Sequence, residues 1–165
     1  MQTLSILGLQ FTISLFLFGF MAKWLAEPHY LKGSGAKVLQ VFLLINSFRY
    51  LPLSLYMPGQ VADGFPDTVK HIVALGDFAS GITAIIAMLL VHTKSSQSKA
   101  AVWFFSIVST LDMVMALSGA IGSRVDTLPL GANYFTVVVY VPMLLVIQLI
   151  IYRILIKGPA TLWKS

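Results

Sequence analysis

The 165-residue chain is too apolar for a water-soluble fold, because 58% of its residues are hydrophobic and 10% are charged, against about 25% charged residues in an ordinary soluble domain. Its net charge of +5 does not indicate nucleic-acid binding, because the basic residues border long apolar segments, where they contact lipid headgroups. The absence of cysteine excludes disulfides, thiolate metal sites and iron–sulfur clusters.

Five apolar segments follow one another along the chain, and each is long enough for a helix to cross a hydrocarbon layer about 30 Å thick. They run over residues 5–25, 38–57, 71–93, 100–122 and 133–156. The first has neither a basic start nor a small-residue cleavage site, so we interpret it as a retained span and not as a signal peptide. The sequence therefore predicts an all-α bundle of five transmembrane helices, with residues 1–165 forming a single transmembrane domain.

Basic residues are distributed unequally between the two sides of the predicted bundle. One side, which we call the basic side, holds Lys23, Lys32, Lys37, Lys94, Lys99, Arg153, Lys157 and Lys164. The opposite side, which we call the acidic side, holds Lys70 and Arg124 together with Asp63, Asp67 and Asp126. The positive-inside rule then predicts that the N-terminus lies outside and the C-terminus lies in the cytoplasm.

Three charged side chains lie well inside the predicted spans: Arg49 in the second, Asp77 in the third and Asp112 in the fourth. At 1.5 Å per helical residue, all three lie roughly 9 to 15 Å below the acidic side. A charge at that depth costs at least about 2.5 to 3.5 kcal/mol on insertion scales, so we expect mutual pairing inside the bundle. The excess negative charge would be balanced by a proton on one Asp, a cation or a cationic ligand.

Helical spacing adds polar and small residues to the faces that carry these charges. The stripes are Asn46, Arg49, Leu53 and Tyr56 in the second span, Asp77, Ser80, Gly81 and Ala84 in the third, and Ser109, Asp112, Ala116 and Gly119 in the fourth. We predict that the ligand or ion candidates are Arg49, Asp77, Asp112, Asn46, Ser80, Ser109 and Tyr56. Small residues permit close helix approach, so the third and fourth spans are predicted to touch through these faces.

Two prolines interrupt the predicted spans near this layer. Pro52 releases the carbonyl of Phe48, and Pro142 releases the carbonyl of Val138. These are either ordinary kinks of membrane helices or backbone acceptors presented to the polar layer.

Cofactor and catalytic chemistry find little support in the sequence. His71 and His92 lie at opposite ends of the third span, which does not favour a bis-His haem, and no lysine lies in mid-span for a retinal Schiff base. The segment Ala74 to Asp77 is similar to the Gly-x-Gly-Asp signature of intramembrane aspartyl proteases, with Asp112 as the second acid. However, Ala74 replaces the first glycine, and the order of the two acidic helices is reversed. We predict no catalytic residue, metal site or cofactor.

Several short motifs resemble those of an uncharacterised family of small bacterial inner-membrane proteins. They are Arg49, Pro58-Gly59, Gly76-Asp77, Val102 to Phe105 leading to Asp112, and Leu130 to Phe135 leading to Val141-Pro142. The resemblance implies a multi-pass protein of the bacterial cytoplasmic membrane and carries no activity with it.

The leading functional hypothesis is a non-enzymatic membrane protein that binds or passes a small solute, a proton or a cation through the polar layer. The alternative is a structural or accessory subunit whose ion pair only stabilises the bundle. A lipid-modifying enzyme is a third hypothesis, supported by the acid pair alone. The expected partners are the lipid bilayer and the solute or ion, with a second copy or a partner membrane subunit left open.

Overall fold

The computed structural model describes residues 3–26, 28, 35–158 and 160–163, and these residues include no strand. The long helices are α1 (Thr3–Met21), α3 (Gly35–Ser47), α4 (Asp67–His92), α5 (Ser98–Gly122) and α7 (Val141–Lys157). Shorter segments are the π-helical η1 (Ala22–Ala26) and η4 (Thr136–Tyr140), the 3-10 helices η2 (Phe48–Tyr56), η3 (Val125–Thr127) and η5 (Ala160–Trp163), and the single turn α6 (Asn133–Phe135).

Five continuous helical stretches are long and apolar enough to cross a membrane, as predicted. They are Thr3–Trp24, Gly35–Tyr56, Asp67–His92, Ser98–Gly122 and Asn133–Lys157. The third begins four residues before the predicted start at position 71, because its first turn is polar and an apolar pattern does not register it. Pro66 precedes this helix in an extended conformation, and the carboxylate of Asp67 is favourable at a helix N-terminus. The lengths and hydropathy are those of a multi-pass membrane protein.

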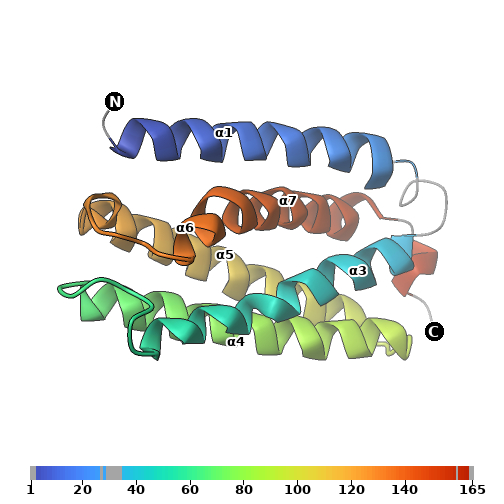
Figure 1. Cartoon of the computed structure of the whole chain (residues 1–165). Coiled ribbons are helices and arrows are strands. Elements are labelled where there is room, and N and C mark those ends of the chain that lie inside the picture. The colour runs from blue at the N-terminus through green and yellow to red at the C-terminus, as the bar shows by residue number, and fades with distance from the viewer. Residues whose placement is uncertain (1–2, 27, 29–34, 159, 164–165) are drawn as a thin grey trace.

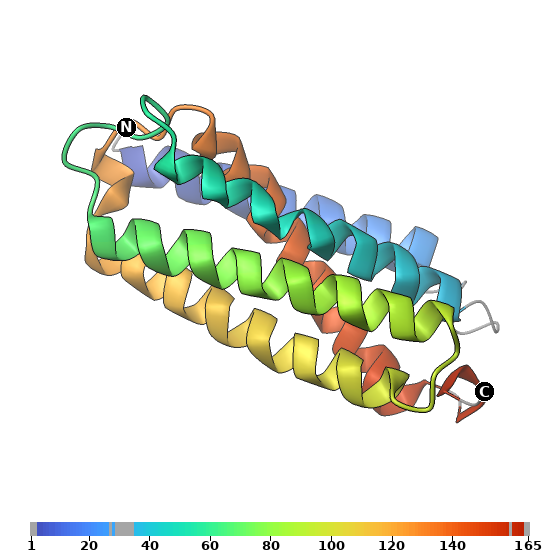
Figure 2. The same cartoon turned by 90° about the horizontal axis from the view of Figure 1, so that it is seen from below.

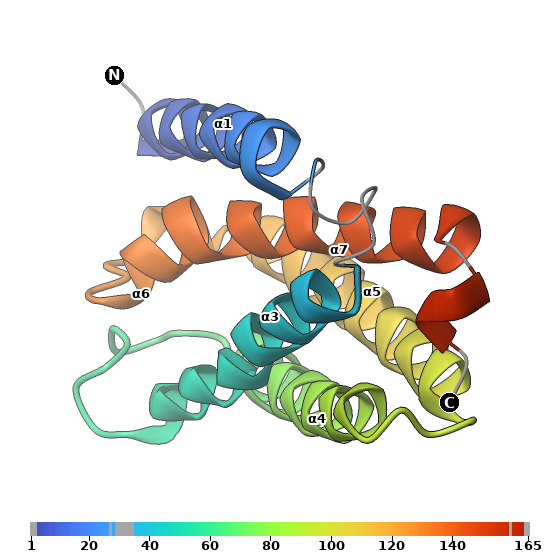
Figure 3. The same ribbon diagram turned by 90° about the vertical axis from the view of Figure 1, so that its right-hand side faces the viewer.

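Four of the helices form the body of the bundle, and α1 lies at its edge. In the view from below, α4 and α5 run side by side, and α3 with η2 crosses α4 (Figure 2). α7 contacts both α5 and α3. α1 packs against α7 and η4 without burying any of its own residues (Figure 3).

The loops gather at the two ends of the bundle. The loops over residues 57–66 and 123–132 lie at one end, near the N-terminus, and the turn after α4 lies at the other end with the C-terminal segment (Figure 1). This is the grouping on which the basic and acidic sides were defined. Lys32 and Lys164 of the basic side lie outside the described residues.

The predicted contact between the third and fourth spans is confirmed, but the prediction that Gly81 takes part in it is wrong. A Cβ atom at Gly76 would collide with the carboxylate of Asp112 on α5. A Cβ atom at Gly81 would instead lie 3.2 Å from the carbonyl oxygen of Ser47, beside the η2 backbone. Residues one turn apart share a face, so Asp77 and Gly81 face η2, whereas Gly76 and Ser80 face α5.

A cluster of buried apolar residues lies in the half of the bundle next to the basic side, and we call it the apolar cluster. Four helices, α3, α4, α5 and α7, contribute to it. Its buried members are Leu39, Leu43, Ala84, Ala87, Val91, Val102, Phe105, Ile147, Ile151, Ile154 and Leu155. This core closes the bundle on the basic side of the polar layer.

Candidate functional site

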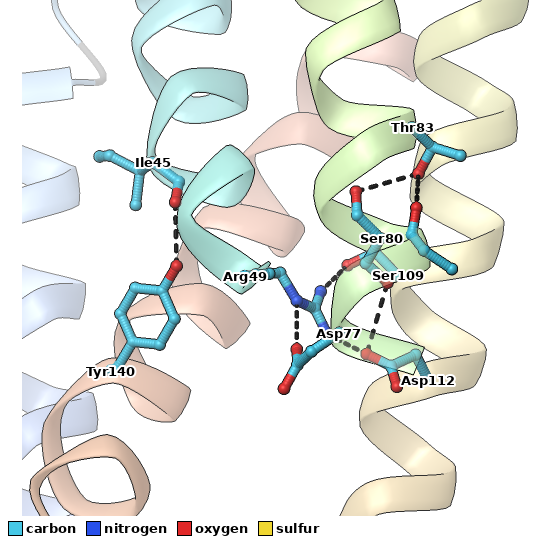
Figure 4. A network of polar contacts seen from close by, with 9 residues as sticks. Ile45, Arg49, Asp77, Ser80, Thr83, Ser109, Asp112 and Tyr140 are labelled. Atoms are coloured by element: carbon cyan, nitrogen blue, oxygen red, sulfur yellow. Dashed lines mark hydrogen bonds and ion pairs between the residues drawn. The ribbon is translucent and has the colours of Figure 1, made fainter. Parts of the chain in front are cut away.

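Arg49 is the centre of a buried polar network that joins three helical segments (Figure 4). Its Nε donates to Asp77 Oδ1 on α4 over 2.6 Å, and its Nη1 donates to Ser109 Oγ on α5 over 2.5 Å. Its Nη2 donates to Asp112 Oδ2, also on α5. Ser80 on α4 donates to the same Asp112 oxygen over 3.4 Å. The structure therefore brings together five of the seven predicted candidates, and we call these five residues the polar layer.

Burial differs sharply among the charged members of the polar layer. Arg49 is 1% exposed and Asp112 is 6% exposed, whereas the Asp77 side chain retains 15% of its accessible surface. A buried guanidinium is tolerated only when its donors are matched by acceptors, since breaking such a pair costs several kcal/mol. Three matched donor groups explain how Arg49 can lie inside an apolar bundle. The layer carries one positive and two negative formal charges when both acids are ionised.

The local sequence around Asp77 makes room for the second acid. Gly76 precedes it, and the missing side chain leaves the space that the Asp112 carboxylate occupies. Any other residue at position 76 would displace the Asp112 carboxylate from this place. The Gly76-Asp77 pair thus places one acid on the η2 side of α4 and admits the other acid from α5.

The remaining two candidates, Asn46 and Tyr56, lie outside the polar layer. Asn46 is buried, but its amide donates to the Phe42 carbonyl of its own helix over 2.8 Å. Tyr56 is 41% exposed, and its hydroxyl lies 2.6 Å from His71 Nδ1.

The winding of η2 explains why Tyr56 leaves the predicted stripe. From Arg49 to Tyr56 an α-helix would turn through about 700°, whereas a 3-10 helix turns through about 840°. Tyr56 is therefore rotated by about 140° from the position that regular α-helical spacing gives. The prediction failed because it assumed one helical period throughout the second span.

Tyr140 on η4 is a part of the site that was not predicted. Its hydroxyl donates to the backbone carbonyl of Ile45 over 3.0 Å, close to the point where α3 changes into the 3-10 helix η2. Where the backbone hydrogen-bond pattern changes from α-helical to 3-10, one carbonyl is left without its usual backbone donor. The backbone acceptor that receives a side chain here is the carbonyl of Ile45, which neither Pro52 nor Pro142 releases.

A cavity of about 140 Å³ lies between the polar layer and the loops of the acidic side. Arg49 and Asp77 form its polar floor, and Tyr140 contributes to its wall. Asn133 and Thr136 are its other polar lining residues. The rest of the lining is apolar and consists of Pro52, Leu55, Phe65, Val69, Val73, Met113, Ala116, Leu117, Ala120, Val125, Leu130, Val137, Val141 and Leu144. The cavity is thus an apolar chamber with one charged surface.

A hydrogen bond beside the chamber joins the loop over residues 57–66 to the start of α6. The amide of Asn133, at the start of α6, donates to the Gln60 carbonyl over 3.1 Å. Tyr134 donates to Gln10 and so ties the same segment to α1. These contacts hold η4, which carries Tyr140 and Thr136, against the rest of the bundle.

Comparison with known proteins places the chain in a family. A family model described as a domain of unknown function (DUF8737) matches residues 6–156. The chain belongs to the DUF8737 family. Searches of curated proteins and of solved structures gave no match.

The part of the chain that the DUF8737 model covers contains the whole polar layer and every residue of the cavity. This agrees with the expectation of an uncharacterised family. The family description assigns no activity, so the chemistry of the site carries the functional argument.

Sequence reasoning missed the cavity residues Asn133, Thr136 and Tyr140, all near the start of the fifth span. Asn133, Thr136 and Tyr140 follow one another at spacings of three and four residues, which places them on one face of a helix. This spacing is a signal in the sequence that could have identified them. The sequence does not otherwise single them out, because this span contains no charged residue at the depth of Arg49, Asp77 and Asp112.

Proposed function

We propose that this chain is a multi-pass protein of the bacterial cytoplasmic membrane that binds a small organic cation in the chamber above the polar layer. The observation that carries the proposal is a partly accessible carboxylate, Asp77, at the floor of a mostly apolar cavity. Concave, mostly apolar sites with a few polar groups are typical ligand-binding sites. An ionisable residue within a membrane span also favours a ligand or ion site.

The size and lining of the cavity favour a particular class of ligand. A cavity of about 150 Å³ holds one benzene molecule, and this chamber measures about 140 Å³. A sugar or a nucleotide is larger than the chamber and would leave its hydroxyl groups against apolar walls. A compact apolar group bearing one charge is therefore the best fit.

The sign of the ligand's charge follows from the floor of the chamber. Arg49 is already ion-paired with both Asp77 and Asp112, so the polar layer has one excess negative charge when both acids are ionised. A ligand ammonium group would meet the carboxylate of Asp77, and hydrogen bonds to charged groups contribute about 1.5–3 kcal/mol. An anion would meet the carboxylate of Asp77 and a guanidinium that is already paired.

Binding is favoured over passage because the apolar cluster lies on the far side of the polar layer from the chamber. The apolar cluster fills the bundle between the polar layer and the basic side, and Leu43, Phe105 and Ile151 in it are fully buried. An ion moving through that region would leave all its hydrogen-bond partners, which is costly in a medium of low polarity. The chamber therefore serves as a binding site entered from the acidic side.

A ligand series tests the proposal directly. Benzylamine, benzyl alcohol and benzoate share one ring and differ in charge, and each is added at millimolar concentration to the purified protein in detergent. Benzylamine should raise the melting temperature most, because it alone places a cation at Asp77. Asp77→Asn should abolish that difference, since it removes the charge and keeps the shape. Equal shifts for all three compounds would overturn the proposal.

A cavity-filling variant separates binding in the chamber from non-specific adsorption. Ala116 lines the chamber, so Ala116→Phe should remove the benzylamine response. Ala79 on α4 is exposed and serves as the matched control, because Ala79→Phe adds the same ring to the outer surface. A benzylamine response that survives in Ala116→Phe would show that the ligand binds elsewhere.

The orientation of the protein is part of the proposal and rests on the unequal distribution of basic residues. Reporter fusions after Lys99 and after Ser165 should report the cytoplasm, and a fusion within the 63–67 loop should report the outside. The chamber then opens to the periplasm. A periplasmic C-terminus would contradict both the orientation and the side of entry.

The structural or accessory role is the second candidate, and one observation favours it. Arg49 is 1% exposed and has a partner for each of its three nitrogen atoms, as expected of an ion pair that only fixes the helices. This role predicts loss of stability when the pair is broken but no response of the wild type to any ligand. The benzylamine series distinguishes the two functions.

A further inference from the structure

Asp112 has one carboxyl oxygen that the network around Arg49 leaves unused. Oδ2 accepts from Arg49 and from Ser80, whereas Oδ1 is buried and has no hydrogen-bond partner among the described residues. It lies beside Gly76, where a side chain would collide with it. A buried acceptor without a donor costs about 1–3 kcal/mol, and more when it is charged. A proton on Asp112 removes most of this cost.

The neighbouring acid supports the presence of such a proton. Asp77 and Asp112 bind different nitrogen atoms of the same guanidinium, which brings their carboxyl groups close together. Ionised carboxylates only accept hydrogen bonds, so a bond between two carboxyl groups exists when one of them is protonated. Two acids placed this close cannot both ionise easily, because their charges repel.

No further positive charge faces the acid pair from the described residues around it. η2 contributes Arg49, α4 contributes Asp77, and η4 contributes the neutral hydroxyl of Tyr140 in the chamber wall. Nearer the acidic side, Lys70 is paired with Asp67 over 2.5 Å. His71 is likewise engaged with Tyr56 over 2.6 Å. The charge on Arg49 alone must therefore balance the pair.

Resting on the proposed function, we propose that Asp77 and Asp112 share one proton while the chamber is empty and release it when an organic cation binds at Asp77. The charges balance in both states. In the empty site, Arg49 carries one positive charge and the protonated acid pair carries one negative charge. In the occupied site, Arg49 and the ligand carry two positive charges and the two carboxylates carry two negative charges. The released proton leaves through the chamber to water on the acidic side.

Proton exchange makes ligand affinity depend on pH with a definite sign. A cation that displaces a proton binds more tightly as pH rises, by up to about tenfold per pH unit while the pair is protonated. The dependence ends at the pH where the empty pair loses its proton unaided. A structural Asp112 without a proton would give no such slope.

Calorimetric titration of benzylamine into the wild-type protein, in buffers of different ionisation enthalpy, counts the protons released. We expect about one proton per bound benzylamine. In Asp112→Asn the release should vanish and affinity should fall, because the amide that replaces the carboxyl group has no proton to release and the bound cation leaves the site positively charged. Asp63→Asn changes an exposed acid in the loop over residues 57–66, outside the site, and should behave like the wild type.

Infrared spectroscopy gives a readout that does not require a ligand. The empty wild-type protein should show the carbonyl band of a protonated carboxyl group, and this band should disappear in Asp112→Asn and on addition of benzylamine. Binding of benzylamine without proton release would overturn the exchange and leave the proposed binding function intact. Absence of benzylamine binding would overturn both, and absence of the carboxyl band would overturn the shared proton alone.

Discussion

We call the half of the bundle next to the acidic side the acidic half, and the half next to the basic side the basic half. Both are built from the same four spans, but they differ in helical regularity. In the basic half, α3 and α7 are regular α-helices, and their side chains close into the apolar cluster. In the acidic half, the same spans continue as the 3-10 helix η2 and the π-helix η4. The chamber lies between these two irregular segments, with Pro52 on one wall and Tyr140 on another.

This difference shows where a membrane bundle tolerates irregular backbone. Regular helices satisfy their own backbone groups and can pack against one another without a gap. Irregular segments leave groups such as the Ile45 carbonyl, which here receives the Tyr140 hydroxyl. Such backbone is tolerated at membrane depth when it is buried in protein or lines a cavity. Interruptions of this kind are also frequent at functional sites. The acidic half therefore carries the site, and the basic half carries the packing.

The strongest test of this comparison is the removal of Arg49. Arg49→Ala should cost about 3–5 kcal/mol of unfolding free energy, because it leaves two buried acids without their cation. The double variant Arg49→Leu with Asp77→Leu should recover much of that loss, since apolar replacement of a buried pair is often neutral. Thermal unfolding in detergent measures both. A wild-type melting temperature in Arg49→Ala would mean that charge does not hold the acidic half together.

A core truncation in the basic half should separate packing from binding. Leu43 is fully buried in the apolar cluster, so Leu43→Ala should cost about 2–5 kcal/mol by leaving a cavity. The benzylamine-induced rise in melting temperature should remain as large as in the wild type. Loss of that response in a folded Leu43→Ala protein would show that the two halves are coupled.

The close approach of α4 to η2 can be tested at Gly81. Gly81→Leu should cost about 1–3 kcal/mol, because its side chain would meet backbone that cannot move aside easily. Gly19 on α1 has no neighbour within 4 Å, so Gly19→Leu is the matched control. Ile85→Leu, elsewhere on α4, should also be tolerated. Melting temperatures that do not distinguish Gly81→Leu from these two variants would contradict the contact.

The smallest expected effect concerns Gln148, a polar residue on α7 beside the apolar cluster. Both of its amide atoms are buried without a partner among the described residues. Gln148→Leu should leave stability unchanged or raise it by about 1 kcal/mol, because it removes unpaired polar atoms. Benzylamine binding and proton release should not change. If Gln148→Leu abolished proton release, the site would extend into the basic half.

Amino-acid pattern alone determined the five spans, the charge difference between the two sides and the common depth of Arg49, Asp77 and Asp112. These follow from length, hydropathy and residue counting, which depend on one span at a time. The cost of a charge in lipid then predicted that the three would meet. Their contacts agree with that expectation, although the function of the layer stays a prediction.

Tertiary structure decided which neighbour each residue of a stripe meets. Gly81 faces η2 while Gly76 faces α5, and Tyr56 turns away from the layer because the second span changes its winding after Ser47. The chamber also belongs to the tertiary structure, since it lies between η2 and η4, which are distant in the sequence. Periodicity within one helix fixes which residues share a face, but only packing between helices fixes what that face touches.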